Sequence, residues 1–343
     1  MANRRETPVT SDADSPQPDE FAFIRRHFKQ LAGVEALGLT DDAALFTPKS
    51  GHDMVVATDT MVEGVHFLPD DPPETLGRKL LRVNLSDIAA MGAQPFGWLL
   101  ALACPRGPGH IARDDAWYAA FAAGVAEDQA RFGVTLLGGD TTSTRGPLVM
   151  SLTILGNVAP GAALRRNGAR HGDGLWVTGT IGDGALGLLA LRGEIPDPDG
   201  WLADRYRLPQ PRLGLMLSGV ANAAMDVSDG LVQDAGHLVR ESGVGVVIDA
   251  DSIPLSAAAR ASGAAAGRFT GENLTTFCAT GGDDYELLLA VPDSASERLL
   301  ESCRLTGTPI SRIGRFDSGV SGARLARADG SDIPLERHGW SHM

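Results

Sequence analysis

Residues 55–67 read Val-Val-Ala-Thr-Asp-Thr-Met-Val-Glu-Gly-Val-His-Phe, an apolar run typical of a β-strand followed by a loop that contains a glycine. The run reaches a Thr-Asp pair, and the loop then presents a histidine. We expect Asp59 and His66 to lie where the strand ends, because ligands of α/β sheets collect at the carboxyl ends of strands. The alternative is an ordinary strand with a solvated loop, and this stretch alone does not decide between the two.

The composition is that of a globular protein and excludes several function classes. The 343 residues suffice for two domains, and 43% hydrophobic with 21% charged residues is typical of a soluble chain. A net charge of −13 lacks the basic surface that a nucleic-acid backbone requires. No apolar run approaches the roughly 18 residues of a membrane span, and the start lacks the apolar core of a signal peptide. We predict a cytoplasmic protein without nucleic-acid or membrane partners.

Two common kinds of site are also excluded. The three cysteines are odd in number and form no C-x-x-C pair, which argues against a disulfide framework and against a zinc site. Lysine occurs only at positions 29, 49 and 79, and none of them follows a G-x-x-x-x-G motif. There is therefore no P-loop lysine to hold a nucleotide phosphate.

Patterning along the chain predicts a tail and two α/β domains. Residues 1–19 are polar and rich in proline, as in a disordered tail. The segments 20–160 and 161–343 each alternate apolar, strand-like runs with helical patterns, but periodicity alone does not give the strand order. The expected helices include 76–91, 114–131, 185–191 and 294–305, and the expected strands include 98–104, 148–158, 244–248 and 285–291.

The helix expected at 76–91 can pack in the core and still present a ligand-binding residue. Its apolar residues recur at i, i+4 and i+7 and form the buried face, whereas Asn84 and Asp87 project together from another side. Asp87 can then reach a ligand while its helix stays packed. The alternative, a solvent-facing Asn and Asp, is the commoner arrangement.

Glycine-containing turns offer contacts to phosphate. Gly138 and Gly139 end the strand that starts at Val134, and glycines there let the backbone approach a ligand closely. At 175–184 a strand leads through a glycine-rich turn into a helix, which suits an anion at the helix N-terminus. Hairpins also use Gly-Gly, and carboxylates such as those at 226–231 also cap helices without any ligand. Neither signal is decisive alone.

Acidic residues recur at the expected ends of elements, mostly beside Gly, Ser or Thr. Carboxylates gathered in one cleft would repel each other by about 3 kcal/mol per pair at about 5 Å and an effective dielectric of about 20, so such a site requires cations. Oxygen ligands without cysteine favour Mg²⁺, which usually joins one or two carboxylates to substrate phosphates. We infer nucleotide-phosphate chemistry, although each carboxylate taken singly is equally consistent with a solvated surface. The residues are Asp41, Asp42, Asp59, Asp87, Asp140, Asp226, Asp229, Asp283 and Asp284.

Together these motifs resemble the thiamine-monophosphate kinase family, part of a superfamily with aminoimidazole ribonucleotide synthetase and selenophosphate synthetase. N-L-S-D-I-A-A-M-G-A is shared across the superfamily, whereas V-E-G-V-H-F is more particular to this kinase. The matches run in the family's order from about residue 20 to the C-terminus. They are D-D-A-A-L (41–45), T-D-T-M-V-E-G-V-H-F (58–67), V-N-L-S-D-I-A-A-M-G-A (83–93), L-G-G-D-T-T (137–142), D-V-S-D-G-L (226–231) and G-G-D-D-Y-E-L (281–287).

The resemblance implies an activity and a fold. The activity is ATP-dependent phosphorylation of thiamine monophosphate to thiamine diphosphate, the final step of thiamine diphosphate biosynthesis, by direct in-line transfer with several Mg²⁺ ions. The fold is α/β (α+β) with two domains of the aminoimidazole ribonucleotide synthetase type. The N-terminal domain (20–160) binds ATP and Mg²⁺, and its sheet pairs with that of a second copy in a homodimer. The C-terminal α/β domain (161–343) completes the active cleft.

Residue roles follow from the resemblance position by position, and none of them is a catalytic acid, base or nucleophile. The implied Mg²⁺ ligands are Asp42, Ala57 through its carbonyl, Thr58, Asp59, Asp87, Asp140, Asp226 and Asp229. The implied ATP contacts are Gly139, Asp140, Arg166 and Ser228. The implied contacts to the thiamine substrate are His66, Asp283 and Trp340.

The chain departs from the family pattern at two positions. Thr40 stands where the family usually has Gly, and threonine resists a positive φ. Asp283 stands where the family usually has Glu, which shortens a substrate contact by one methylene.

Two other functions stay open. A sister ATP-dependent synthetase of the superfamily would keep the metal aspartates but change the substrate pocket. A non-catalytic divalent-metal-binding protein would also need acidic clusters, but it would bind Mg²⁺ without dependence on ATP.

Overall fold

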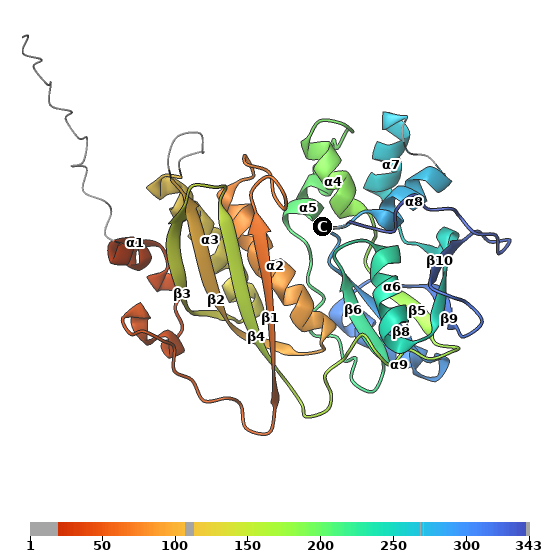
Figure 1. Cartoon of the computed structure of the whole chain (residues 1–343), viewed down its shortest axis with the longest axis horizontal. Coiled ribbons are helices and arrows are strands. Elements are labelled where there is room, and N and C mark those ends of the chain that lie inside the picture. The colour runs from red at the N-terminus through yellow and green to blue at the C-terminus, as the bar shows by residue number, and fades with distance from the viewer. Residues whose placement is uncertain (1–19, 107–112, 268, 270, 341–343) are drawn as a thin grey trace, which may run out of the picture.

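The computed structural model describes residues 20–106, 113–267, 269 and 271–340, and the tail expected at 1–19 lies outside them. Two β-sheets, one in each half of the chain, lie side by side with helix α2 (Pro73–Ala90) between them (Figure 1). This arrangement confirms the predicted two-domain α/β fold. Within the described residues, none of the helices combines the length and the apolar character that crossing a bilayer requires.

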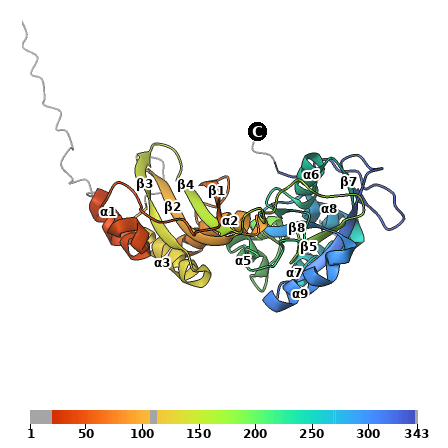
Figure 2. The same ribbon diagram turned by 90° about the horizontal axis from the view of Figure 1, so that it is seen from below.

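The two long helices of the N-terminal half lie on one face of its sheet. The strand order of this sheet is β1-β4-β2-β3, in which the β2–β3 pair is parallel and the other two pairs are antiparallel. Helices α2 and α3 (Asp115–Phe132) cover one face, and Figure 2 shows both of them on the same side of the strands. The strands are β1 (Asp53–Val62), β2 (Gln94–Pro105), β3 (Thr135–Thr144) and β4 (Val149–Val158), and the preceding helices are α1 (Glu20–His27), η1 (Lys29–Leu31) and η2 (Val34–Leu39).

The C-terminal sheet is mixed and has helices on both faces. Its order is β10-β7-β9-β5-β8-β6, with only the β10–β7 pair parallel. Alternate residues of strand β8 are buried in two separate clusters, one with helix α6 and one with helix α9. The strands are β5 (Gly174–Thr178), β6 (Ala223–Val227), β7 (Gly245–Asp249), β8 (Glu286–Val291), β9 (Ile310–Asp317) and β10 (Ala323–Ala326). The helices are α4 (Asp183–Leu191), α5 (Trp201–Arg207), α6 (Leu231–Ser242), α7 (Ala257–Ala266), α8 (Glu272–Thr280) and α9 (Ser296–Thr306), with η3 (Ala250–Ser252) and η4 (Asp293–Ala295).

Helix α2 belongs to both hydrophobic cores. Leu81 and Leu85 are fully buried in the N-terminal core, as their helical spacing predicts. Ala89 and Ala90, at the end of the same helix, pack instead with residues of the C-terminal half such as Leu287. The helix is therefore apolar on more than one side and fixes how the two sheets sit relative to each other.

The expectation that acidic residues follow strand ends is wrong at two places. Strand β1 continues to Val62, so Asp59 lies within it, and β3 continues through Gly139 and Asp140 to Thr144. The strand-end rule applies to parallel sheets, and this sheet is mostly antiparallel. Gly139 is required by the packing of the sheet, because a Cβ there would lie 1.8 Å from the carbonyl oxygen of Leu100 on the neighbouring strand.

The crossing of α2 and α3 gives a test of the packing. A Cβ added at Gly124 of α3 would lie 2.0 Å from the carbonyl oxygen of Glu74, whereas one added at Gly236 of α6 would meet nothing within 4 Å. We expect Gly124→Ala to lower the free energy of unfolding by roughly 1–3 kcal/mol through overpacking. Gly236→Ala should raise it by about 0.5–1 kcal/mol, because alanine is the better helix former.

Urea unfolding monitored by circular dichroism measures both changes. Equal effects of the two substitutions would show that α2 and α3 do not approach as closely as described.

Candidate active site

A cavity of about 670 Å³ opens between the two halves of the chain. Its walls come from β1, α2, α4, the loop between β6 and α6, the loop before β8 and the C-terminal segment. Nine of the predicted site residues line it, which brings together parts of the chain that are far apart in sequence. They are Asp59, His66, Asp87, Arg166, Asp226, Ser228, Asp229, Asp283 and Trp340.

Three carboxylates from three elements meet at the base of this cavity. Asp59 comes from β1, Asp87 from α2 and Asp226 from β6, and the charge of Asp226 raises the pKa of both other carboxyl groups. Asn84 accepts the backbone N–H of Asp59 at 3.1 Å, and the Ser86 hydroxyl donates to Asp226 at 2.7 Å. Both supporting residues belong to the N-L-S-D motif, and Asn84 is fully buried rather than projecting beside Asp87 as expected.

The three carboxylates are poorly solvated. Burial, followed by the charge of Asp226, raises the pKa of Asp59 to about 6 and that of Asp87 to about 8. Burial also raises the pKa of Asp226, partly offset by the Ser86 hydrogen bond and by the charge of Arg166. Each carboxyl group thus resists ionisation unless a cation is near. A set of oxygen donors of this kind fits Mg²⁺.

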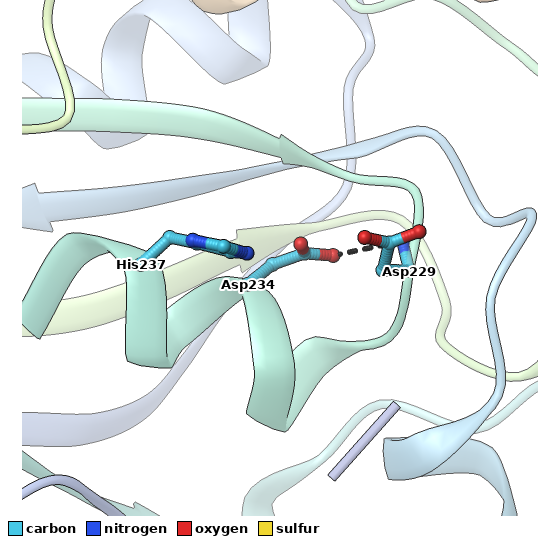
Figure 3. Close-up of side chains that lie close together, drawn as sticks. All are labelled: Asp229, Asp234 and His237. Atoms are coloured by element: carbon cyan, nitrogen blue, oxygen red, sulfur yellow. Dashed lines mark hydrogen bonds between the residues drawn. The ribbon is translucent and has the colours of Figure 1, made fainter. Parts of the chain in front are cut away.

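The loop that follows β6 is held by a carboxylate at its back. One oxygen of Asp234 accepts the backbone N–H groups of Ser228, Asp229 and Gly230, each at 3.1 Å. Figure 3 shows Asp234 turned toward this loop, with His237 one turn further along α6. Potential ligand atoms of Asp229, Asp234 and His237 lie within 4.8 Å of one another. Because Asp234 is engaged by three N–H donors, we interpret it as the support of the Ser228–Gly230 loop.

The same cavity is also lined by an imidazole, a carboxylate and an indole. His66 Nδ1 accepts the backbone N–H of Val62 at 3.0 Å, so the ring proton lies on Nε2. The backbone N–H of Trp340 donates to the carbonyl of Asp229 at 2.9 Å, which places the C-terminal segment over the entrance of α6. Asp283 and Tyr285 have left-handed φ values of 69° and 52°, which non-glycine residues adopt at a cost in backbone strain.

The remaining predicted residues lie elsewhere. Asp42, Gly139 and Asp140 line a second cavity of about 700 Å³ on the face of the N-terminal sheet opposite α2 and α3, to which residues of α1 and η2 also contribute. Ala57 and Thr58 line neither cavity. Strand alternation accounts for Thr58, which points to the face opposite Asp59, whereas Ala57 lies on the same face as Asp59 and packs against the N-terminal core. Within this chain alone, the predicted ligands therefore form two groups.

Two further expectations concern loops. The helix N-terminus after β5 does not receive an external anion, because Asp284 accepts the N–H groups of Gly182 at 2.7 Å and Gly184 at 3.1 Å. The predicted anion site there is wrong, and the second aspartate of the Asp283–Asp284 pair is structural. Thr40 has a φ of −115°, so its replacement of the family's glycine brings no backbone strain at that position.

Comparison with known proteins extends the resemblance to the whole chain. The family models "AIR synthase related protein, N-terminal domain" and "C-terminal domain" match residues 40–158 and 170–324. The curated thiamine-monophosphate kinases of Caulobacter vibrioides and Escherichia coli K12 are 42% and 38% identical to this chain. The alignments cover 96% and 94% of this chain, and 94% and 98% of those proteins. The chain belongs to the thiamine-monophosphate kinase family.

Solved structures agree with this assignment. A thiamine-monophosphate kinase from Stenotrophomonas maltophilia superposes with a TM-score of 0.75 at 37% identity over 86% of this chain and 91% of that one. The structure of AaThiL complexed with AMPPCP and TMP gives 0.74 at 30% identity over 94% and 97%. A hydrogenase maturation protein, HypE, in complex with ATP gives 0.75 at only 19% identity over 95% and 98%, which shows a shared fold alone.

The raised pKa values predict how this thiamine-monophosphate kinase family member responds to pH. A carboxyl group whose pKa rises from 3.8 to about 8 on folding, as for Asp87, binds more protons in the folded state. Its contribution to stability is fully present below the unfolded pKa and is lost as the pH rises toward 8. We therefore expect the metal-free protein to lose stability from about pH 5 to about pH 8, and Asp87→Asn to reduce that loss by at least about 1 kcal/mol.

Urea unfolding in the presence of a metal chelator, at about pH 5 and at about pH 8, measures the change in the free energy of unfolding. Asp70→Asn, at an exposed position shortly before α2, is the matched control and should leave the slope unchanged. Identical pH slopes in wild type and Asp87→Asn would contradict the assignment of the raised pKa to Asp87.

Proposed function

We propose that this chain transfers the γ-phosphoryl group of ATP to thiamine monophosphate, giving thiamine diphosphate, with Mg²⁺ as the required metal. The single observation that carries the proposal is the cavity between the two halves. Desolvated carboxylates line it together with a histidine, a further carboxylate and a tryptophan. The names of the relatives, and the AMPPCP and TMP of the AaThiL complex, support the same two ligands.

The carboxylate end fits metal-bound phosphates. Asp59, Asp87 and Asp226 would hold Mg²⁺, with Asp229 beside them, and bound Mg²⁺ supplies charge neutralisation to the phosphoryl group. Arg166 lines the same cavity and interacts electrostatically with Asp87 and Asp226. Its guanidinium can bind phosphate oxygens in the place where other nucleotide-binding proteins use a P-loop lysine.

The histidine, the Asp283 carboxylate and the tryptophan fit an aromatic heterocycle that carries an amino group. The indole of Trp340 is 49% exposed, so one of its faces can stack on a ring. The Asp283 carboxylate can accept from an amino group, and the Nε2–H of His66 can donate to the substrate. The acceptor phosphate would then point toward the carboxylate end.

The chemistry requires positioning rather than a general base. The nucleophile is an oxygen of a phosphate monoester, which is already anionic near neutral pH. The residues of the cavity therefore orient the two phosphates in line, neutralise their charge and limit access of water. No covalent phosphoenzyme should form.

The face of the N-terminal sheet opposite α2 and α3 supports a homodimer. Val56 of β1 is 61% exposed and Leu99 of β2 is 37% exposed, whereas most apolar side chains of the sheet are buried. Asp42, Gly139 and Asp140 line the second cavity on this face. A second copy pairing here would cover the apolar residues and place further oxygen donors beside the nucleotide, which also accounts for the separation of the predicted ligands into two groups.

The first test is an assay with ATP, Mg²⁺ and thiamine monophosphate, with free thiamine as the control acceptor. We expect thiamine diphosphate from the monophosphate only. Asp59→Asn should lower kcat by about 100-fold or more, because it removes one anionic donor from the metal site. Asp53→Asn changes the same group at the exposed start of the same strand and should leave kcat unchanged.

The outcomes separate the alternatives. Binding of Mg²⁺ and ATP without formation of thiamine diphosphate would favour a sister synthetase of the superfamily with another substrate. Binding of Mg²⁺ that does not depend on ATP, with no turnover of any acceptor, would favour a metal-binding protein. A labelled phosphoenzyme in a single turnover would contradict direct transfer.

A further inference from the structure

Lys79 is a buried lysine in the wall of the active-site cavity. It lies on α2, its side chain is 3% exposed, and its position lines the cavity at the end that carries His66 and Asp283. The lysines at positions 29 and 49 are exposed. Lysine is seldom fully buried unless it is paired, so a specific reason for this burial is expected.

The ammonium group of Lys79 has three partners. It donates to the backbone carbonyl of His66 at 3.3 Å, lies 3.7 Å from the carboxylate of Asp283, and sits 3.5 Å from the centre of the Tyr206 ring. The Tyr206 hydroxyl also donates to the His66 carbonyl, at 3.2 Å. One lysine thus connects both polar residues at this end of the cavity, one through its backbone and the other through its side chain.

We infer that Lys79 is a positioning residue that sets the affinity for the phosphate acceptor by orienting Asp283 and the loop that carries His66. The inference rests on the proposed function, since it concerns the acceptor end of the same cavity. A charged donor beside a partly buried carboxylate fixes its direction more strongly than a neutral donor does. The same ammonium holds the His66 carbonyl, so the spacing between the imidazole and the carboxylate depends on it.

The backbone near Asp283 is held by its own bonds, and the side chain of Asp283 is oriented separately, by Lys79 and by the Tyr285 hydroxyl, which donates to it at 3.4 Å. Asp283 and Tyr285 both have left-handed φ values, so this loop is held in a strained conformation by its surroundings. The backbone N–H groups of these two residues donate to the carbonyls of Ser228 at 2.8 Å and Val227 at 2.7 Å. These bonds fix the main chain, and the Lys79 ammonium acts on the Asp283 side chain that points into the cavity.

A purely structural role of Lys79, as a connection between the two halves, makes different predictions. Arg207 pairs with Asp71 at 2.8 Å, and Arg82 donates to the carbonyl of Pro209 at 3.1 Å, so other bonds join the same two parts of the chain. Loss of Lys79 alone should therefore leave the halves assembled. The loss should weaken binding of thiamine monophosphate and leave binding of ATP unchanged.

The test uses Lys79→Met in the full-length protein, which removes the charge but keeps most of the length and apolar stem. We expect the KM for thiamine monophosphate to rise by about tenfold or more and the KM for ATP to stay within about twofold. Lys49→Met makes the same chemical change at an exposed position and should alter neither constant. Circular dichroism and the melting temperature verify that both variants are folded.

A double-mutant cycle with Asp283→Asn tests the mechanism. If Lys79 acts through Asp283, the double variant should bind the acceptor no more than about twofold worse than Asp283→Asn alone, because the two effects are not additive. Equal rises in both KM values of Lys79→Met, or fully additive effects in the cycle, would overturn the inference.

The wild-type assay keeps the two proposals apart. If wild type makes thiamine diphosphate and Lys79→Met retains its KM for thiamine monophosphate, the inference fails and the proposed function stands. If wild type makes no thiamine diphosphate, the proposed function fails. Isothermal titration of wild type and Lys79→Met with thiamine monophosphate then decides the inference, since equal affinities overturn it.

Discussion

Mutual repulsion of three carboxylates, one buried and two half-buried, is the constraint that organises this molecule. Asp59, Asp87 and Asp226 come from a strand, a helix and a strand of the other half, and burial raises the pKa of each. A protein keeps such an arrangement only where a cation and its anionic ligand provide compensating charge. The supporting bonds of Asn84 and Ser86 show that the surrounding structure holds the carboxylates in place.

Helix α2 positions this arrangement, because one of its sides lines the cavity and its other sides contact the two sheets. Lys79, Val83 and Asp87 recur every four residues and line the cavity along one side of the helix. Asn84 and Ser86 face the two sheets and bond to Asp59 and Asp226. The acceptor end and the metal end of the cavity are thus set about two helical turns apart by a single rigid element.

Much of the architecture could be predicted from local pattern, and the errors have physical causes. Helices α2 and α3 follow from apolar spacing, and the motif order identifies the family. The positions of Asp59 and Gly139 within strands were missed, because periodicity reports that a strand exists and not whether its neighbours run parallel. Asp284 and Asp234 were not separable from ligand carboxylates by sequence, since only the folded chain shows which carboxylate is engaged by backbone N–H groups.

The sharing of α2 between both cores also bears on how the molecule folds and evolves. Neither half can be excised intact, because cutting after the N-terminal sheet exposes Ala89 and Ala90, and cutting before α2 leaves the C-terminal core without part of its wall. The chain should therefore melt as one cooperative unit in calorimetry. Recombination between relatives would preserve function only where helix α2 and the two cores that it packs against come from the same parent.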